Sequence, residues 1–175
     1  MRATGLLALA FGLIYATNIC AQTGWYRLKG PNDVFAVELP SQPSYETQNG
    51  MSDGGTPFIV HVYELIHDGR EFNVQTTTYP SDVDVSDPRA ILENALAENA
   101  AVLAEKKWDK ISWMQLQGSP AVELIGAYND NHHARNYYIL KGRQLYAIGY
   151  AGPPGTLQSD DANRFFGSFR ILSES

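Results

Sequence analysis

The sequence predicts an α+β fold in which helices pack on a single antiparallel sheet of about six or seven strands. Apolar residues alternate with period two over most of the chain, and short turns separate these runs. Only two segments carry a helical period instead. They predict a main helix at about 87–105 and a C-terminal helix at about 159–168.

The first 21 residues are typical of a secretory signal peptide. An apolar run from Leu6 to Ala16 is too short to span a bilayer, and we expect cleavage after Ala21. Lipidation of Cys20 is an alternative, but lipidation sites favour a small residue before the cysteine, and Ile19 stands there. We therefore expect a periplasmic or extracellular protein with a single domain at 22–175 and no transmembrane anchor.

The stability of the mature chain has to come from its core. Cys20 is the only cysteine, so no disulfide can form within the chain. With 44% hydrophobic residues, a domain of about 150 residues can bury enough apolar surface to fold without one.

The charge balance disfavours polyanionic partners. Arg2 is one of 13 basic residues and leaves with the signal peptide, so 12 remain against 19 acidic residues, a formal net charge of −7. A nucleic acid should be repelled by such a chain. The basic residues look scattered, and their one cluster, at Lys106, Lys107 and Lys110, is expected at the end of the main helix.

The N-terminal half predicts three strands and one long loop. Phe35–Leu39 alternates and stops at a proline. The polar, glycine-rich stretch 41–56 is expected to be a loop, with at most a short strand around 45–47. Two apolar-rich runs, 58–66 and 72–79, then form a hairpin.

The main helix is expected to begin at Asp87 and Pro88, an N-cap followed by a first-turn proline. Its apolar stripe comprises Ile91, Leu92, Ala95, Leu96, Val102 and Leu103, and its outer face carries Glu93, Asn94 and Glu98.

After the main helix, four strand-like runs separated by short turns predict an antiparallel meander at 111–116, 121–128, 134–140 and 144–150. Ser159 and two acids then open the closing helix, whose apolar stripe is Ala162, Phe165, Phe166 and Phe169.

Four segments together resemble the bacterial branch of the PsbP/Mog1-like fold family. They are Phe35–Pro40, Gly118–Ala121, Gln144–Tyr146 and Asp161–Arg170, and the likeness extends over nearly all of the mature chain. These are packing positions, so the resemblance implies a fold rather than an activity. It also implies a scaffold or binder, because better-known relatives serve the photosynthetic oxygen-evolving complex or bind a small GTPase.

Two clusters contain potential metal ligands. Asp130, His132 and His133 lie in or beside a hairpin turn, where imidazoles and a carboxylate can hold a transition metal. A solvated turn is the simpler explanation, because adjacent histidines in a strand point to opposite faces.

The second cluster, Asp82, Asp84 and Asp87, offers carboxylate oxygens suited to calcium. It lacks the glycine turn and the bidentate glutamate of a calcium loop. Helix capping by Asp87 with two solvated acids explains it as well.

Catalytic motifs and cofactor-binding motifs are absent from the sequence, so we expect neither catalytic residues nor a cofactor. The leading hypothesis is an exported binding or accessory protein whose partner is another envelope protein; no particular oligomeric state is indicated. An alternative is a carrier of a small apolar ligand or a metal, and a less favoured one is an enzyme with a dispersed site built from Glu123, Arg135 and His132. Most aromatic residues are expected in the core, and a minority could line a groove; the set is Trp25, Tyr26, Trp108, Trp113, Tyr137, Tyr138, Tyr146 and Tyr150.

Overall fold

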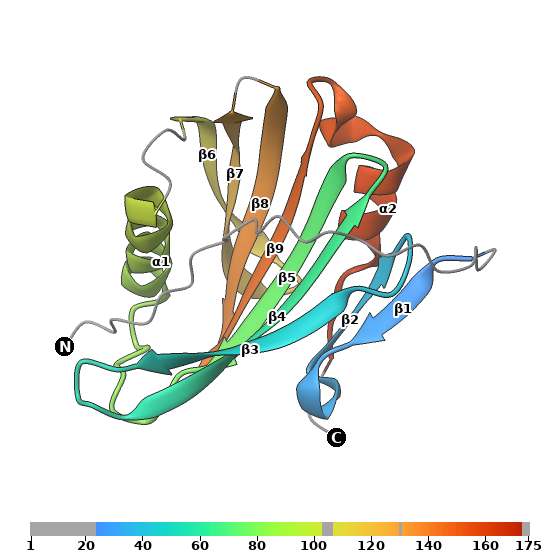
Figure 1. Cartoon of the computed structure of the whole chain (residues 1–175). Coiled ribbons are helices and arrows are strands. Elements are labelled where there is room, and N and C mark those ends of the chain that lie inside the picture. The colour runs from blue at the N-terminus through green and yellow to red at the C-terminus, as the bar shows by residue number, and fades with distance from the viewer. Residues whose placement is uncertain (1–23, 103–106, 130, 173–175) are drawn as a thin grey trace.

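The described part of the chain contains two antiparallel sheets and two α-helices (Figure 1). A computed structural model describes residues 24–102, 107–129 and 131–172. A seven-stranded sheet forms the centre, α1 covers one of its faces, and a small sheet together with α2 covers the other. The predicted α+β class and the seven-stranded antiparallel sheet are confirmed.

The central sheet has the order β3-β4-β5-β9-β8-β7-β6, so the two halves of the chain meet where β5 pairs with β9. Four of its hairpin turns place residues in the left-handed region, at Gly55, at Asp68 and Gly69, at Gln117 and Gly118, and at Gly142. The strands are β3 (Ser44–Met51), β4 (Pro57–His67), β5 (Arg70–Thr78), β6 (Lys107–Leu116), β7 (Ser119–Asn129), β8 (His132–Lys141) and β9 (Gln144–Gly152).

A second sheet, which the sequence did not predict, has three short strands in the order β1-β2-β10. Its strands are β1 (Tyr26–Lys29), β2 (Phe35–Leu39) and β10 (Arg170–Ile171), and the 3-10 turn η1 (Pro31–Asp33) joins the first two. The alternation in Phe35–Leu39 correctly indicated a strand, but a period of two does not specify the partner strands.

Half of the stretch expected as a long loop is a strand. β3 occupies eight residues of it and pairs with β4 along its whole length, from Ser44 opposite Glu64 to Met51 opposite Pro57. Its side chains are mostly exposed on both faces, so the apolar alternation of a half-buried strand is missing. Pairing with β4 supplies the stability that the sequence pattern does not show.

Helix α1 (Pro88–Val102) begins as predicted. One carboxylate oxygen of Asp87 accepts hydrogen bonds from the backbone N–H groups of Arg89 and Ala90. The stripe at Ile91, Leu92 and Ala95 is buried against the sheet. The predicted end of this helix, at 103–105, lies outside the described residues.

The lysine cluster does not lie at the end of this helix. Lys107 and Lys110 belong to β6, and the side chain of Lys110 approaches Glu123 of β7; Lys106 lies outside the described residues. Within residues 24–102, 107–129 and 131–172, no helix is long and apolar enough to cross a membrane.

Helix α2 (Asp160–Ser168) closes the opposite face. The hydroxyl of Ser159 caps it by accepting a hydrogen bond from the backbone N–H of Ala162. Phe165 is fully buried and contacts Phe72 of β5 edge to face at 5.2 Å, and Phe169 stacks on Phe35 of β2 at 5.8 Å. Phe165 of α2 and Phe169, which directly follows the helix, thus join the small sheet to the central one.

Replacing Phe165 with alanine should therefore lower the free energy of unfolding by about 3–5 kcal/mol, because it leaves a cavity in this core. Phe166→Ala is a matched control in the same helix, since Phe166 is only partly buried. Urea denaturation of both variants tests the expectation. Equal losses would show that α2 is not anchored through Phe165.

Candidate functional site

Ile111 of β6 is 51% exposed, and three other strongly exposed apolar side chains gather where β3 and β4 form the opposite edge of the central sheet. The small sheet packs over this face only as far as Tyr63, through residues such as Phe35 and Val37. Beyond it, Tyr45 is 55% exposed, and Met51 and Ile59 are each 50% exposed. We call the residues Tyr45, Met51, Ile59, His61 and Tyr63 the β3 edge surface.

Its aromatic rings hold one another in place. The ring of Tyr45 stacks on Tyr63 at 4.9 Å and lies nearly parallel to His61 at 6.1 Å. The Tyr45 hydroxyl and Nδ1 of His61 are 2.9 Å apart, within hydrogen-bonding distance. Tyr63 is buried and contacts Phe35 of the small sheet, so the exposed ring of Tyr45 rests on the core.

Both titratable neighbours of Tyr45 favour their neutral forms. Burial lowers the pKa of His61 below its ordinary value. Burial, reinforced by Tyr45 and Tyr26, raises the pKa of Tyr63 to about 12. The surface is therefore uncharged at neutral pH, which suits an apolar contact.

A groove of about 350 Å³ adjoins this surface between the small sheet and the ends of β4, β5 and β9. Its walls are mainly apolar or carry hydroxyl and amide groups, a mixture that can hold a side chain and orient polar atoms. The lining residues are Pro31, Asn32, Val34, Pro57, Phe58, Ile59, His61, Thr76, Thr78, Pro80 and Gln144.

The two edge strands of the central sheet differ in their protection against a further strand. β6 carries Lys107, Asp109 and Lys110 and has an irregular register between Trp108 and Lys110, and both features discourage pairing at an edge. β3 has a regular register, no lysine and no proline, and Glu46 is its one charged residue. The edge at β3 is therefore the open one.

A carboxyl group lies on the opposite face of the same two strands. Burial, with Glu46 and Glu71 nearby, raises the pKa of Glu64 to about 7, although a hydrogen bond from the side-chain amide of Asn73 opposes the shift. The charge behind the β3 edge surface therefore changes close to neutral pH.

The structure brings together two of the three residues proposed for a dispersed enzyme site. Arg135 Nε donates to Glu123 at 2.8 Å, and the Tyr137 hydroxyl donates to the same carboxylate at 2.7 Å. Burial alone would raise the pKa of Glu123, but these partners outweigh it and hold the pKa below its usual value. His132 does not join them, because the alternation along β8 places its side chain on the other face from Arg135.

The calcium candidates serve the turn before α1. Asp84 accepts a hydrogen bond from the backbone N–H of Ser86, and Asp87 caps the helix. Asp82 accepts from the Ser52 hydroxyl, a hydrogen bond that is the leading cause of its lowered pKa.

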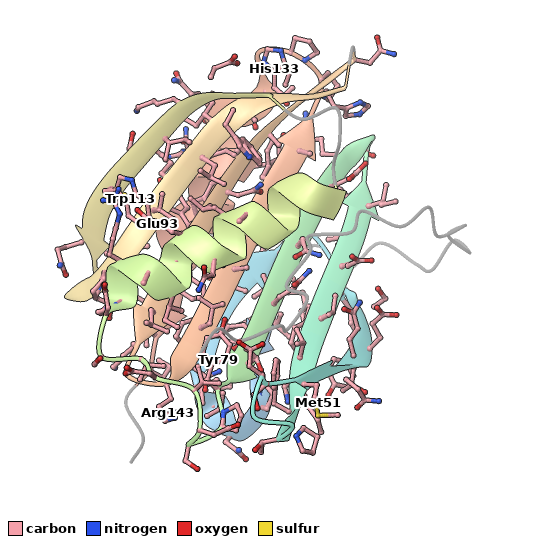
Figure 2. All side chains as sticks on the ribbon, turned by 90° about the vertical axis from the view of Figure 1, so that its left-hand side faces the viewer. Met51, Tyr79, Glu93, Trp113, His133 and Arg143 are labelled. Carbon is pink, nitrogen blue, oxygen red and sulfur yellow. The ribbon has the colours of Figure 1, made fainter. Side chains whose placement is uncertain are left out.

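The second metal candidate lies at the far end of the sheet. Figure 2 shows His133 at the end opposite Met51 and Arg143. His132 and His133 begin β8 and alternate between its faces; Asp130 lies outside the described residues. In the part of the chain that the structure describes, no three His, Cys, Asp or Glu side chains are grouped to hold a metal ion.

Solved structures resemble this chain in fold although little in sequence. Cyanobacterial PsbP (CyanoP) from Synechocystis sp. PCC 6803 matches with a TM-score of 0.57 and 14% identity, over 89% of this chain and 98% of that one. The fold is PsbP-like. A crystal structure from Bacteroides thetaiotaomicron matches with a TM-score of 0.50 and 10% identity, over 85% of this chain.

The chain spans about half of the Bacteroides protein, covering 48% of its length. No family model and no curated protein matches the sequence. The resemblance to the PsbP/Mog1-like family is thus supported at the level of fold, and identities this low show nothing finer.

Sequence reasoning missed the β3 edge surface because it treated the segment as a loop. Of the eight aromatic residues considered in the sequence, which did not indicate which ones are buried, Tyr137, Tyr138, Tyr146 and Tyr150 lie in the core of this PsbP-like fold. One signal was available: Ser44–Met51 contains no proline and precedes a strong strand at a hairpin distance.

The raised pKa of Glu64 predicts a pH dependence of stability. The unfolded chain releases this proton near pH 4.5 and the folded protein near pH 7, so the ionisation destabilises the fold as pH rises through this window. Above pH 7, the free energy of unfolding of Glu64→Gln should therefore be about 1 kcal/mol higher than that of the wild type. This figure is reduced for solvent screening, because Glu64 is only half-buried.

Below about pH 4.5 the difference should vanish, and urea denaturation across the window measures it. Glu93→Gln, which removes an exposed carboxylate on α1, is the control and should show no such trend. A Glu64→Gln difference that is independent of pH would contradict the assignment.

Proposed function

We propose that this protein is an exported, non-catalytic binding or accessory module of the cell envelope, from the bacterial branch of the PsbP/Mog1-like family. Its β3 edge surface receives an extended segment of another envelope protein. The observation that carries this proposal is the exposed, ordered aromatic and apolar surface beside an unprotected sheet edge. Three lines of support follow.

The first support is the chemistry of the edge itself. An added strand gains backbone hydrogen bonds along β3, and alternate side chains of that strand face Tyr45, Ile59 and the adjoining groove. Backbone pairing supplies affinity, and the side-chain contacts supply specificity.

The second support is the asymmetry between the two edges. A solvent-exposed edge without lysines, proline or a bulge is an aggregation hazard unless something covers it. β6 carries such protection and β3 does not. A partner that covers β3 explains why this edge has been left without it.

The third support concerns the choice of partner. A second copy of this chain would bring together two molecules whose mature net charge is −7, which opposes self-association. A different protein avoids that repulsion. The expected signal peptide favours an encounter outside the cytoplasm.

Export is tested by the N-terminus of the protein recovered from a periplasmic fraction. Mass spectrometry should find a chain that begins at Gln22, because Ala21 precedes the expected cleavage site. A lipid-modified chain beginning at Cys20 would keep the protein in the envelope but tether it. An uncleaved chain in the cytoplasm would refute export.

Binding at the edge is tested by site-specific photo-crosslinking in the native cells. A photoreactive residue at Asn49 of β3 should capture a defined partner, and one at Gln115 of β6, the matched position on the other edge, should not. Adding Tyr45→Lys and Ile59→Lys to the Asn49 probe should abolish capture, because two charges enter the apolar surface. Both side chains are exposed, so the fold should tolerate the changes.

Met114→Lys is the control, since Met114 is an exposed apolar residue on β6. It should leave capture at Asn49 intact. A product that contains only two copies of this chain would replace the partner hypothesis with self-association. Capture that survives the Tyr45 and Ile59 changes would remove the β3 edge surface from the binding site.

A further inference from the structure

A second feature, distinct from the β3 edge surface, is a groove on the outer face of the small sheet. It measures about 430 Å³, and its lining residues come from β1, β2, α2 and β10. Three of them are arginines, in a chain whose mature net charge is −7. The lining residues are Arg27, Ala36, Val37, Glu38, Arg164, Gly167, Ser168 and Arg170.

The pairing of the small sheet explains how these arginines meet. Arg27 of β1 stands opposite Glu38 of β2, and Arg170 of β10 stands opposite Ala36. These four positions share one face, because alternate residues of a strand point the same way. Arg164 reaches the same face from α2 and pairs with Glu38.

Small residues leave the groove hollow. Ala36 lies between the two outer strands, and Gly167 and Ser168 form the helix wall. The Ser168 hydroxyl is already engaged, since it accepts from the backbone N–H of Glu38 and donates to the carbonyl of Phe165. The residues that form the floor are therefore small, and the Ser168 hydroxyl has no free hydrogen-bonding capacity. The free hydrogen-bond donors of the groove belong to the arginines.

Only one of the three positive charges is neutralised. Arg164 Nε donates to Glu38 at 2.8 Å, whereas Arg170 donates to the backbone carbonyl oxygens of Gly167 and Phe169, which carry no net charge. Arg27 is exposed and has no ion-pair or hydrogen-bond partner among the described residues. The groove thus keeps an excess of about two positive charges.

The donors are also held in place. The guanidinium of Arg164 lies over the ring of Trp25 at 4.5 Å, which fixes its plane and leaves its remaining N–H groups at the edge. The two carbonyl contacts fix Arg170 at the end of α2. An incoming anion therefore meets the two oriented guanidinium groups of Arg164 and Arg170, and the guanidinium of Arg27 can move to contact it.

We propose that this groove binds a phosphoryl group. An excess of about two positive charges matches a phosphate monoester, which carries about −1.5 to −2 charges at neutral pH and three acceptor oxygens. Arginine forks bind such oxygens in pairs, and donors from three separate strands or helices suit a tetrahedral anion better than a planar carboxylate. The phosphoryl group belongs either to a soluble phosphate or to a lipid headgroup.

The test uses inorganic phosphate and the mature protein, with the side-chain Nε–Hε signals of the arginines followed by NMR at constant ionic strength. Phosphate should shift the signals of Arg27, Arg164 and Arg170 saturably, with a dissociation constant of about 1–10 mM. Affinity should fall several-fold as the pH drops from about 8 to about 6, because inorganic phosphate loses its second negative charge near neutral pH. Glu38 is the one carboxylate that lines the groove.

Arg27→Gln is the decisive variant, since Arg27 is exposed and unpaired, so the fold should be unaffected. It should weaken phosphate binding at least about tenfold, and Arg27→Lys should restore part of the affinity because it keeps the charge but not the fork. Lys141→Gln removes one exposed positive charge elsewhere and should change nothing.

Vesicles distinguish the two sources. Retention on vesicles that contain phosphatidic acid, whose headgroup is a phosphate monoester, but not on phosphatidylcholine vesicles, lost in Arg27→Gln, assigns the site to a lipid headgroup. Binding of inorganic phosphate without vesicle retention assigns it to a soluble phosphate. Acetate that binds as tightly as phosphate would overturn the phosphoryl assignment. Signals that shift without saturation, or equally in Arg27→Gln, would overturn the site itself.

Discussion

The structure depends on burying both faces of one antiparallel sheet. On one face, Val122, Leu124, Tyr138 and Ala147 pack beneath α1; on the other, Phe72, Tyr146 and Ile148 pack beneath the small sheet and α2. Apolar burial on two sides stabilises the central strands and fixes their register, because a slip by one residue would exchange the two faces. The covering elements do not reach β3, and the exposed apolar residues of the molecule lie at such uncovered margins.

Much of this arrangement is visible in the sequence. Strands with strong apolar content and short turns were located within a few residues, and the caps at Asp87 and Ser159 marked both helix starts. The failures have physical causes. β3 is solvated on both faces and lacks a hydrophobic pattern, and the partners of Phe35–Leu39 lie far away in the chain, where local patterns carry no information.

The two proposed binding surfaces could not be predicted from the sequence for the same reason. Arg27, Arg164 and Arg170 look scattered along the chain and meet only because β10 pairs beside β2. Tyr45 belongs to a surface only because β3 pairs with β4. Packing residues can be inferred from local periodicity, whereas a site assembled from distant segments requires the topology.

The two-residue strand β10 also orders events during folding. It completes the small sheet against β2, more than a hundred positions earlier in the chain, and the following residue, Leu172, donates its backbone N–H to the carbonyl of Val34. A chain that emerges N-terminus first therefore presents β1 and β2 long before their last partner exists. Until then, Phe35 and Val37 have no finished core to enter. The small sheet should therefore remain incomplete until residues 170–172 have emerged from the ribosome.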